Sequence, residues 1–355
     1  MPTTRAHPRP EHPLATALAQ RRHDGHTGYL RDHAHALGTS ELTLLLATRP
    51  ELPAATAVDW GRLFAALRDA GTLKTMTRNE SVVLERTGRI EALHIDETHL
   101  QVVGADIDLR GFPGRWHAAL AVADETPRGQ RRSVQLFDRC GDSVFKAYLD
   151  ERAADHETTW ATLCTLLATA RHVGPDDPLD ARRPVDTRVP AALDVPAFHA
   201  AWDALTDTHD FHRLLARVGI GRRAAMDVAG GARATRLAAT TLESLLLAAR
   251  ERAQPLMLFV GNAGMIQIHH GVPRRLSDSG GWFNVLDPGM NLHVRREQLE
   301  SAWIVRKPTA HGMVSAVEFF DDRGEQVLLV HAERRDTTPG DAPAWSAILA
   351  ALPRA

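Results

Sequence analysis

The sequence predicts an α+β protein made by tandem duplication, in which each copy folds as an antiparallel β-meander sheet with flanking helices. Three observations lead to this fold class. The two halves of the chain align at one constant offset, helical periodicity comes before strand-like alternation in each half, and a stretch rich in proline and aspartate separates them. A chain of 355 residues is long enough for two domains that each bury a core.

The duplication is visible as an offset of 183 residues between matching positions. This offset pairs Asn79 with Asn262 and sets Arg110 opposite His293. The aligned segments are 77–93 with 260–276, 106–112 with 289–295, and 133–149 with 316–332. Because one offset holds for all three pairs, and because a solenoid needs more than two copies, the chain is predicted to contain two similar domains.

Each copy begins with helices and continues with strands. Segments 58–71 and 240–253 place apolar residues at helical spacing, which predicts one helix in each copy. Segments 133–138 and 316–330 alternate or carry runs of β-branched residues, and glycine-containing turns typical of hairpins lie next to them. An antiparallel meander is therefore expected after the helices.

The predicted boundary between the copies is segment 174–196. It is rich in proline and aspartate and lacks helical or strand periodicity, which is typical of a linker. We therefore expect an N-terminal repeat over residues 1–173 and a C-terminal repeat over residues 197–355.

Composition excludes several classes of protein. The formal net charge is −2, so the bulk charge gives no reason to expect a nucleic acid as partner. No apolar run reaches the length of about 18 residues that suggests a membrane span, and the first residues lack the apolar core of a signal peptide, so we expect a cytoplasmic protein. Cys140 and Cys164 form no CxxC motif, which argues against a disulfide framework and a cysteine-built zinc site.

The segment TDTHDFHRLLARVGIGRR, residues 206–223, combines histidines with several arginines. Thr206 or Asp207 is expected to cap a helix whose first turn carries His209 and His212. The simplest interpretation is a solvated amphipathic helix with its apolar side chains buried. A catalytic zinc site would need a third protein ligand and usually an acidic base, whereas haem needs one neutral imidazole, an apolar slot and cations for its propionates. The segment fits haem better than zinc.

Six segments resemble the bacterial hemin-degrading and haem-trafficking factors of haem-uptake operons. The resemblance covers nearly the whole chain from about residue 30, and it includes the duplication. Its most specific segments are TDTHDFHRLL, FVGNAGMIQIHHG, SAWIVRKPT with VSAVEFFDDRGEQV, DLRGF, and SVQLFDRCGD.

The resemblance implies an iron ligand on one side of the haem and an arginine on the other. His209, in the T-D-x-H motif, would be the proximal iron ligand, and Arg110, in DLRGF, would approach the distal side. A guanidinium stays protonated, so it could stabilise a distal water or developing negative charge without ligating iron. Phe112 keeps the aromatic character expected near the pocket, and positive positions around the haem edge match Arg222, Lys307 and Arg334, with Arg335 as the alternative to Arg334.

Two positions depart from the family pattern. Position 331 is His where relatives carry Tyr, so His331 could bond a propionate or compete for iron. Position 212 is His where some relatives have a pocket Phe, so His212 could be a second ligand. The offset places His26 opposite His209, but without the T-D-x-H context. We therefore expect one haem per chain, held between the copies, and a non-covalent haem b because no CxxCH motif occurs.

The resemblance leaves two functions open. The first is an enzyme that opens the macrocycle and releases iron, with Arg110 as a catalytic residue. The second is a trafficking protein that carries intact haem from an importer to a separate haem oxygenase. No GxGxxG fingerprint follows a strand, so electrons are expected to come from an external donor. The resemblance favours degradation.

Overall fold

The chain divides into two compact units that differ in extent from the sequence repeats. The computed structural model describes residues 11–127, 129–238, 240–334 and 340–355. Unit 1 comprises residues 1–70 and 113–182, and unit 2 comprises residues 71–112 and 183–355. Most of the first repeat's early strands thus belong to the unit formed by the second repeat.

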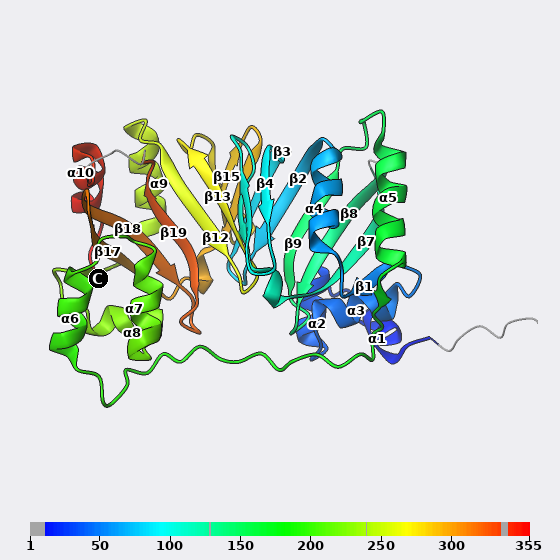
Figure 1. Cartoon of the computed structure of the whole chain (residues 1–355), viewed down its shortest axis with the longest axis horizontal. Helices are drawn as coiled ribbons and strands as arrows, with labels where there is room; N and C mark the ends of the chain where they lie inside the picture. The colour runs from blue at the N-terminus through cyan, green and yellow to red at the C-terminus, as the bar shows by residue number, and fades with distance from the viewer. Residues whose placement is uncertain (1–10, 128, 239, 335–339) are drawn as a thin grey trace, which may run out of the picture. The chain divides into compact units, whose positions relative to one another are not determined.

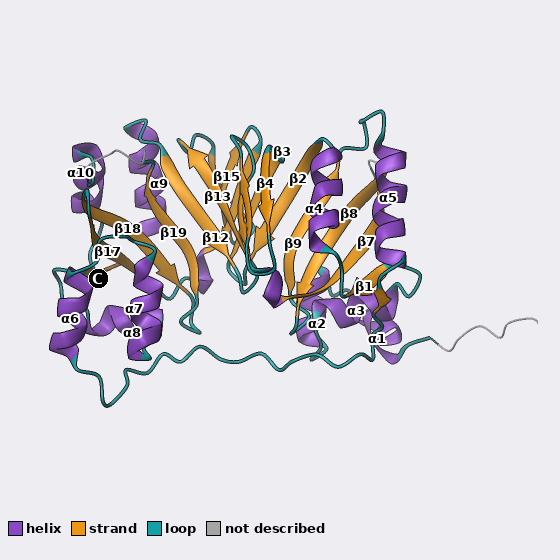
Figure 2. Cartoon of the chain, viewed as in Figure 1, coloured by secondary structure: helices purple, strands orange, loops and turns teal. Residues whose placement is uncertain are grey.

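Unit 1 is an antiparallel sheet with helices on its faces (Figures 1 and 2). Its helices are α1 (Pro13–His23), α2 (Leu30–Ala36), α3 (Glu41–Thr48), α4 (Trp60–Asp69), the 3₁₀ turn η1 (Pro113–Arg115) and α5 (His156–Ala168). Its strands are β1 (Ala54–Thr56), β7 (Trp116–Thr126), β8 (Gly129–Asp138), β9 (Ser143–Leu149) and β10 (Arg171–His172). They pair in the order β10-β1-β7-β8-β9.

Unit 2 contains the other helices and strands, and its larger sheet has nine strands in the order β11-β17-β18-β19-β12-β13-β6-β5-β4. Strands of the first repeat are β2 (Thr72–Arg78), β3 (Val82–Arg89), β4 (Ala92–Ile95), β5 (Leu100–Val103) and β6 (Asp108–Gly111). Strands of the second repeat are β11 (Ala234–Leu237), β12 (Leu256–Gly261), β13 (Met265–Gly271), β14 (Leu276–Ser279), β15 (Trp282–Asp287), β16 (Met290–Arg295), β17 (Ser301–Thr309), β18 (Gly312–Phe320) and β19 (Gln326–Ala332). The helices are α6 (Val195–Asp203), α7 (Asp210–Val218), α8 (Arg222–Val228), α9 (Thr241–Glu251), η2 (Arg296–Gln298) and α10 (Pro343–Ala351).

The predicted fold class is confirmed, with one feature that the sequence did not predict. The repeats exchange strands: β6 of the first repeat pairs with β13 of the second, and β16 of the second pairs with β3 of the first. Each repeat therefore completes a sheet of the other. The exchange places Arg110, on β6, in the same sheet as the strands that follow α7 and α8.

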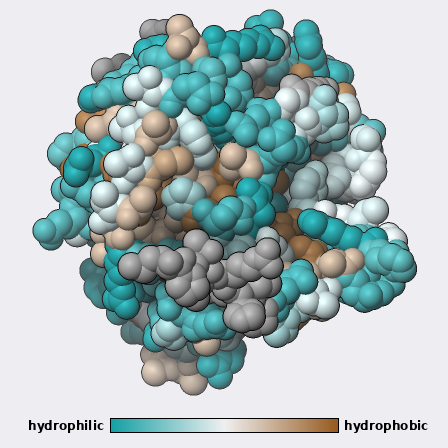
Figure 3. All heavy atoms as spheres, turned by 90° about the vertical axis from the view of Figure 1, so that its right-hand side faces the viewer, coloured by the Kyte–Doolittle hydropathy of each residue, from teal (hydrophilic) through white to brown (hydrophobic). Residues whose placement is uncertain are grey.

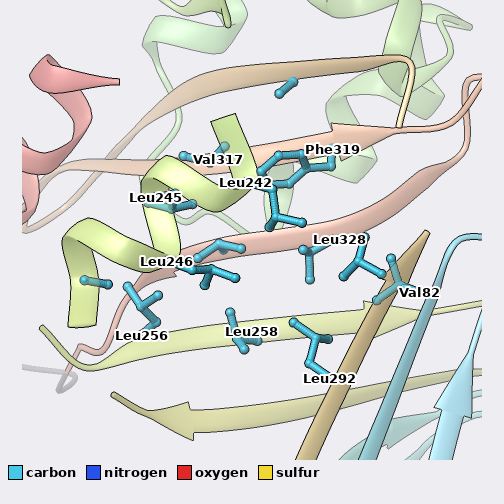
Figure 4. Close-up of a cluster of buried hydrophobic side chains, with 14 of the residues drawn as sticks. Val82, Leu242, Leu245, Leu246, Leu256, Leu258, Leu292, Val317, Phe319 and Leu328 are labelled. Carbon is cyan, nitrogen blue, oxygen red and sulfur yellow. The ribbon is translucent and has the colours of Figure 1, made fainter. Parts of the chain in front are cut away.

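The core of unit 2 lies under α9 and α10 on one face of the nine-stranded sheet. Figure 4 shows leucines of α9 against the inward side chains of the strands. The buried residues of this core include Leu242, Leu245, Leu246, Leu258, Phe319 and Leu328. Both predicted helices form within the expected segments, α4 at 60–69 and α9 at 241–251, and Asp59 caps α4 by accepting a hydrogen bond from the backbone amide of Arg62.

The opposite face of this sheet carries α6, α7 and α8 at one end (Figure 1). Trp202 of α6 donates from Nε1 to the carbonyl of Arg306 at 2.8 Å, which joins the helices to β17. Between β10 and α6, residues 173–194 form no helix or strand. This stretch lies within the predicted linker except for its first residue.

The face in Figure 3 is mostly hydrophilic, with small hydrophobic areas between. Among the described helices, none is long and apolar enough to cross a membrane.

Two asparagines matched by the repeat connect the β2–β3 turn of the first repeat with the β12–β13 turn of the second. Asn79 donates from Nδ2 to the carbonyls of Gly261 and Val327, at 3.0 and 2.8 Å, and Asn262 donates to the carbonyl of Arg78 at 2.9 Å. The Oδ1 atom of each asparagine accepts from two backbone amides of its own turn. The two turns thus hold each other by the same hydrogen bond in both directions.

We predict that Asn79→Ala lowers the free energy of unfolding by about 1–3 kcal/mol, because it leaves partly buried carbonyls and amides without a partner. Urea denaturation measures this loss. Asn79→Asp is the matched control, since it keeps the acceptor for the turn but removes the donor. If the aspartate variant were as stable as the wild type, the bonds to Gly261 and Val327 would contribute nothing.

Candidate functional site

His209 lies immediately before α7 and not in its first turn. The helix begins at Asp210, so the predicted cap at Thr206 or Asp207 is wrong: His209 itself occupies the N-cap position. The carboxylate of Asp207 instead accepts from the backbone amide of His209 at 2.8 Å and from its ring Nδ1 at 2.7 Å. The hydrogen bond from the backbone amide is the largest cause of a lowered pKa of Asp207, and the bond from the ring adds to it.

This contact gives the imidazole of His209 a defined orientation. With Nδ1 donating to Asp207, the Nε2 atom carries the free lone pair, and a carboxylate on Nδ1 makes Nε2 a better metal ligand. The side chain of His209 is 88% exposed, so Nε2 is accessible. His212 is also exposed, and its Nδ1 lies 2.6 Å from the carbonyl oxygen of His209.

The apolar side of α7 is buried as predicted, through Phe211, Leu214 and Leu215. Two cations lie over the ring of Phe211: the Nζ of Lys307 at 4.7 Å and the guanidinium of Arg222 at 5.2 Å from its centroid. Because Phe211 is two residues after His209, these contacts hold the start of α7 and thereby His209.

Arg222 and Lys307 share one buried carboxylate, that of Glu318. Arg222 donates to it from Nε and Nη2 at 2.7 and 2.8 Å, and Lys307 donates from Nζ at 2.9 Å. Glu318 is fully buried, Lys307 is 6% exposed and Arg222 is 27% exposed. We call these three residues the ion triad. It has one more positive than negative charge.

The ion triad shifts the pKa values of its members. Burial alone would raise the pKa of Glu318, but Arg222 and Lys307 beside it bring the value down to about 2. Burial lowers the pKa of Lys307 to about 8, although Glu318 opposes this shift. All three groups are therefore charged at neutral pH.

Strand register places the ion triad and His331 on one face of the nine-stranded sheet. Directly opposed residues of antiparallel strands point to the same face, as do residues two apart along a strand. Glu318 opposes Leu329, which is two residues before His331, and His331 opposes Met257 on the next strand. This face is the one that carries α6–α8.

The same register continues to Arg110. Met257 opposes His270 on β13, and His270 is four residues after Ile266, which opposes Arg110 on β6. Arg110 and His331 are three strands apart, a span of roughly 14 Å. The exchanged strand thus brings Arg110 to the same face as His331.

Half-exposed apolar side chains cover the middle of this face. β12 has the apolar sequence LMLFVG. Every second residue is buried in the core, and the residues between them, which point to the face that carries α6–α8, are only partly buried. We call this surface the open face; its apolar members are Met257, Phe259, Ile266 and Leu329. The ring of His331 lies 5.1 Å from that of Phe259, and burial lowers the pKa of His331 to about 4, so this imidazole is neutral.

Arg110 is held at the far side of the open face. Its Nη1 donates to the carbonyls of Val102 and Leu109, at 3.1 and 2.9 Å, and to the carboxylate of Asp108. The second oxygen of Asp108 lies 3.4 Å from the Nε2 of His270. Phe112 is half-buried, and its amide donates to the carbonyl of Gly264 at 3.0 Å.

The remaining predicted residue is Arg334, just after β19 and half-buried. Its predicted alternative, Arg335, lies outside the described residues. Within the described ranges there is no group of three or more His, Cys, Asp or Glu side chains that could hold a metal ion.

The structure adds three residues that our sequence analysis missed. They are Glu318, Asp108 and His270. A signal existed for two of them: Glu318 is the only charged residue in the segment SAVEFF, and Asp108 precedes Arg110 by two residues in a strand, which places both on one face. His270 could be found only from the pairing of β13 with β6.

We predict that Glu318→Gln lowers the free energy of unfolding at pH 7 by about 3–5 kcal/mol, because it leaves two buried cations without a counter-charge. Lys307→Met is the matched variant and should cost less, since the pair of Arg222 with Glu318 stays neutral. Urea denaturation of both variants measures the difference. Equal losses would contradict the role of Glu318 as the shared counter-charge.

The ion triad also predicts acid sensitivity. Since the pKa of Glu318 is depressed in the folded state, its contribution to stability is present above its usual value near 4.5 and is lost as the pH falls toward 2. The wild type should lose more stability than Glu318→Gln over this window.

Comparison with known proteins identifies the family. The model of the family described as "Haemin-degrading HemS.ChuX domain" matches residues 38–167 and again residues 219–352, one match in each repeat. The hemin transport protein HemS of Yersinia enterocolitica is 32% identical over 312 residues, which covers 88% of this chain and 89% of that protein.

Two solved structures are similar over almost the full chain. Holo-PhuS, a heme-binding protein from Pseudomonas aeruginosa, has a TM-score of 0.86 at 35% identity and covers 96% of this chain and 99% of its own. The heme degrading enzyme ChuS of Escherichia coli O157:H7 has a TM-score of 0.85 at 28% identity. The match covers 96% of this chain and 98% of the ChuS chain. Given the two family matches and these relatives, the chain belongs to the haemin-degrading HemS/ChuX family.

Proposed function

We propose that this protein binds one haem b per chain, non-covalently and as a substrate, between His209 and the open face of unit 2. The observation that carries this proposal is that strand register gathers half-buried apolar side chains, the ion triad and a fixed arginine on one face of the sheet. The accessible imidazole of His209 lies at the start of α7, whose Phe211 packs against the cations of the ion triad. These are the features that a non-covalent haem requires. The similarity to holo-PhuS supports the same ligand.

His209 is proposed as the proximal iron ligand. Its Nδ1 is engaged by Asp207, and no described residue bonds its Nε2, which is the arrangement found in many metal-binding histidines. His212 is a weaker candidate for this role, because its Nδ1 lies against a carbonyl within the same turn. His331 is neutral and close to Phe259, so it is the second alternative.

The carboxylates of the haem are proposed to meet the positive charge at one end of the open face. The ion triad supplies one net positive charge, and Arg222 is its more exposed cation. Arg334 supplies a further charge just after β19. A propionate would interact with Lys307 mainly through this net charge, since the side chain of Lys307 is almost completely buried.

Arg110, with Phe112 beside it, is proposed to act on the distal side in haem degradation. The macrocycle would be opened at a meso carbon and its iron released, with electrons from an external donor and either with O₂ as the oxidant or by a reductive route. Arg110 lies on β6, which is paired on both sides, and a positively charged guanidinium there can stabilise negative charge that develops during the reaction. ChuS, which has a similar structure, is described as a heme degrading enzyme.

The alternative function is transfer of intact haem from an importer to a separate haem oxygenase. One observation favours it: His209 is 88% exposed at a helix start, where a partner could reach the ligand. HemS of Yersinia enterocolitica is described as a hemin transport protein. Either function would place the protein in the cytoplasm, where imported haem is used, and neither needs a nucleic acid.

We predict that His209→Ala shifts the Soret band of the ferric haem complex and weakens haem binding at least tenfold, because the iron loses its protein ligand. Hemin titration followed by absorbance measures both effects. His23→Ala, which removes an 84% exposed histidine of unit 1, is the matched control and should change neither. An unchanged spectrum and affinity in His209→Ala would transfer the ligand role to His212 or His331.

We predict that the haem-loaded protein loses its Soret absorbance when reductant and air are added, in step with iron release and formation of a linear tetrapyrrole. Catalase is included because free peroxide destroys haem in many proteins that are not oxygenases. If catalase abolished the loss, or if haem passed intact to a separate oxygenase faster than it was consumed, the transfer function would replace degradation.

A further inference from the structure

We propose that Asp108 is a positioning residue, which fixes the guanidinium of Arg110 so that its unbonded edge is available to a ligand on the distal side of the haem. The inference rests on the proposed function, because it assumes that haem binds on the open face. It adds Asp108, and its contact with His270, to the residues on which the distal side depends.

The backbone under Asp108 and Arg110 is held on both sides. β6 lies between β13 and β5: Arg110 opposes Ile266 on one neighbour and Gln101 on the other. Because Asp108 and Arg110 are two residues apart in the strand, their side chains leave the same face. Their spacing is thus fixed by the sheet and does not depend on a loop.

The hydrogen bonds of Arg110 leave one side of its guanidinium free. Among the described residues, every bond that Arg110 donates comes from Nη1, to Asp108 and to the carbonyls of Val102 and Leu109. Its Nε and Nη2 have no partner there. The side chain is 35% exposed, so these N–H groups can reach an anion or a polar ligand.

Asp108 is itself fixed. Its side chain is 9% exposed, one oxygen accepts from Arg110, and the other lies 3.4 Å from the Nε2 of His270. A carboxylate held at both oxygens cannot swing away when a ligand approaches. Asp108 therefore reduces the number of conformations that Arg110 samples, and a pre-ordered arginine loses less entropy when it binds an anion.

The proposal can be tested without turnover, by measuring azide binding to the ferric haem complex of the full-length chain. Azide bound to the iron would accept a hydrogen bond from Arg110. We expect Arg110→Ala to weaken azide binding about tenfold while haem affinity stays near that of the wild type. Asp108→Asn, which keeps the size of the side chain but removes its charge, should weaken azide binding by a similar factor.

The double variant separates positioning from an independent effect. If Asp108 acts through Arg110, the double variant Asp108→Asn with Arg110→Ala should bind azide as tightly as Arg110→Ala alone. Asp124→Asn, which affects a carboxylate paired with Arg49 and Arg131 in unit 1, is the matched control and should leave azide affinity unchanged. Asp108→Glu should restore part of the affinity, because it returns the charge at a slightly different position.

The outcomes distinguish this inference from the proposed function. If Arg110→Ala weakened azide binding but Asp108→Asn bound azide as tightly as the wild type, the positioning role of Asp108 alone would be overturned. The positioning role would also be overturned if the loss of azide affinity in the double variant equalled the product of the two single losses. If wild-type protein bound no haem, or if Arg110→Ala bound azide as the wild type does, the distal role of Arg110 would fail first, and the inference would fall with it.

Discussion

The exchange of strands between the two repeats is the constraint on which the candidate site depends. β6 belongs to the first repeat, yet it extends the sheet that the second repeat builds under α6–α8. Without this pairing Arg110 would not share a face with His331 and the ion triad. The reciprocal bonds of Asn79 and Asn262 join the turns that precede β3 and β13, the two strands that pair with the exchanged strands β16 and β6.

Two buried carboxylates organise the charges on the open face. Glu318 holds Arg222 and Lys307 against Phe211, and through Phe211 it fixes the start of α7 near His209. Asp108 holds Arg110 at the other side. In both cases an acidic residue that would not contact the haem iron decides where a cation lies. Buried ion pairs contribute little net stability, but breaking one of them is costly, which suits them to fixing geometry.

Much of the fold was predictable from the sequence, and the part that was not has a physical reason. The duplication follows from the constant offset between the two halves, and the helices α4 and α9 and the antiparallel strands follow from local periodicity. The exchange does not, because pairing of β6 with β13 joins residues far apart in the sequence and leaves no local pattern. For the same reason the compact units differ from the repeats, and residues 71–112 of the first repeat belong to unit 2.

For the candidate site, the residues His209 and Arg110 came from the family resemblance and not from spacing. The predicted start of α7 was wrong because Asp207 bonds His209 instead of capping the helix. Glu318 escaped notice because a single acidic residue in an apolar strand resembles a surface position. Arg222 and Lys307 were expected around the haem edge from the family resemblance, and that role stays a prediction. Their burial and their shared partner Glu318 depend on tertiary packing, which the sequence does not display.

The position of the iron in crystals of the haem-loaded full-length protein, located by anomalous scattering at the iron edge, tests the proposed haem site most directly. We expect one iron per chain, bonded to Nε2 of His209, with the macrocycle over Met257, Phe259 and Leu329 and with Arg110 on the opposite side. Iron bonded to a residue of unit 1, or bound through His212 or His331 with His209 free, would contradict it.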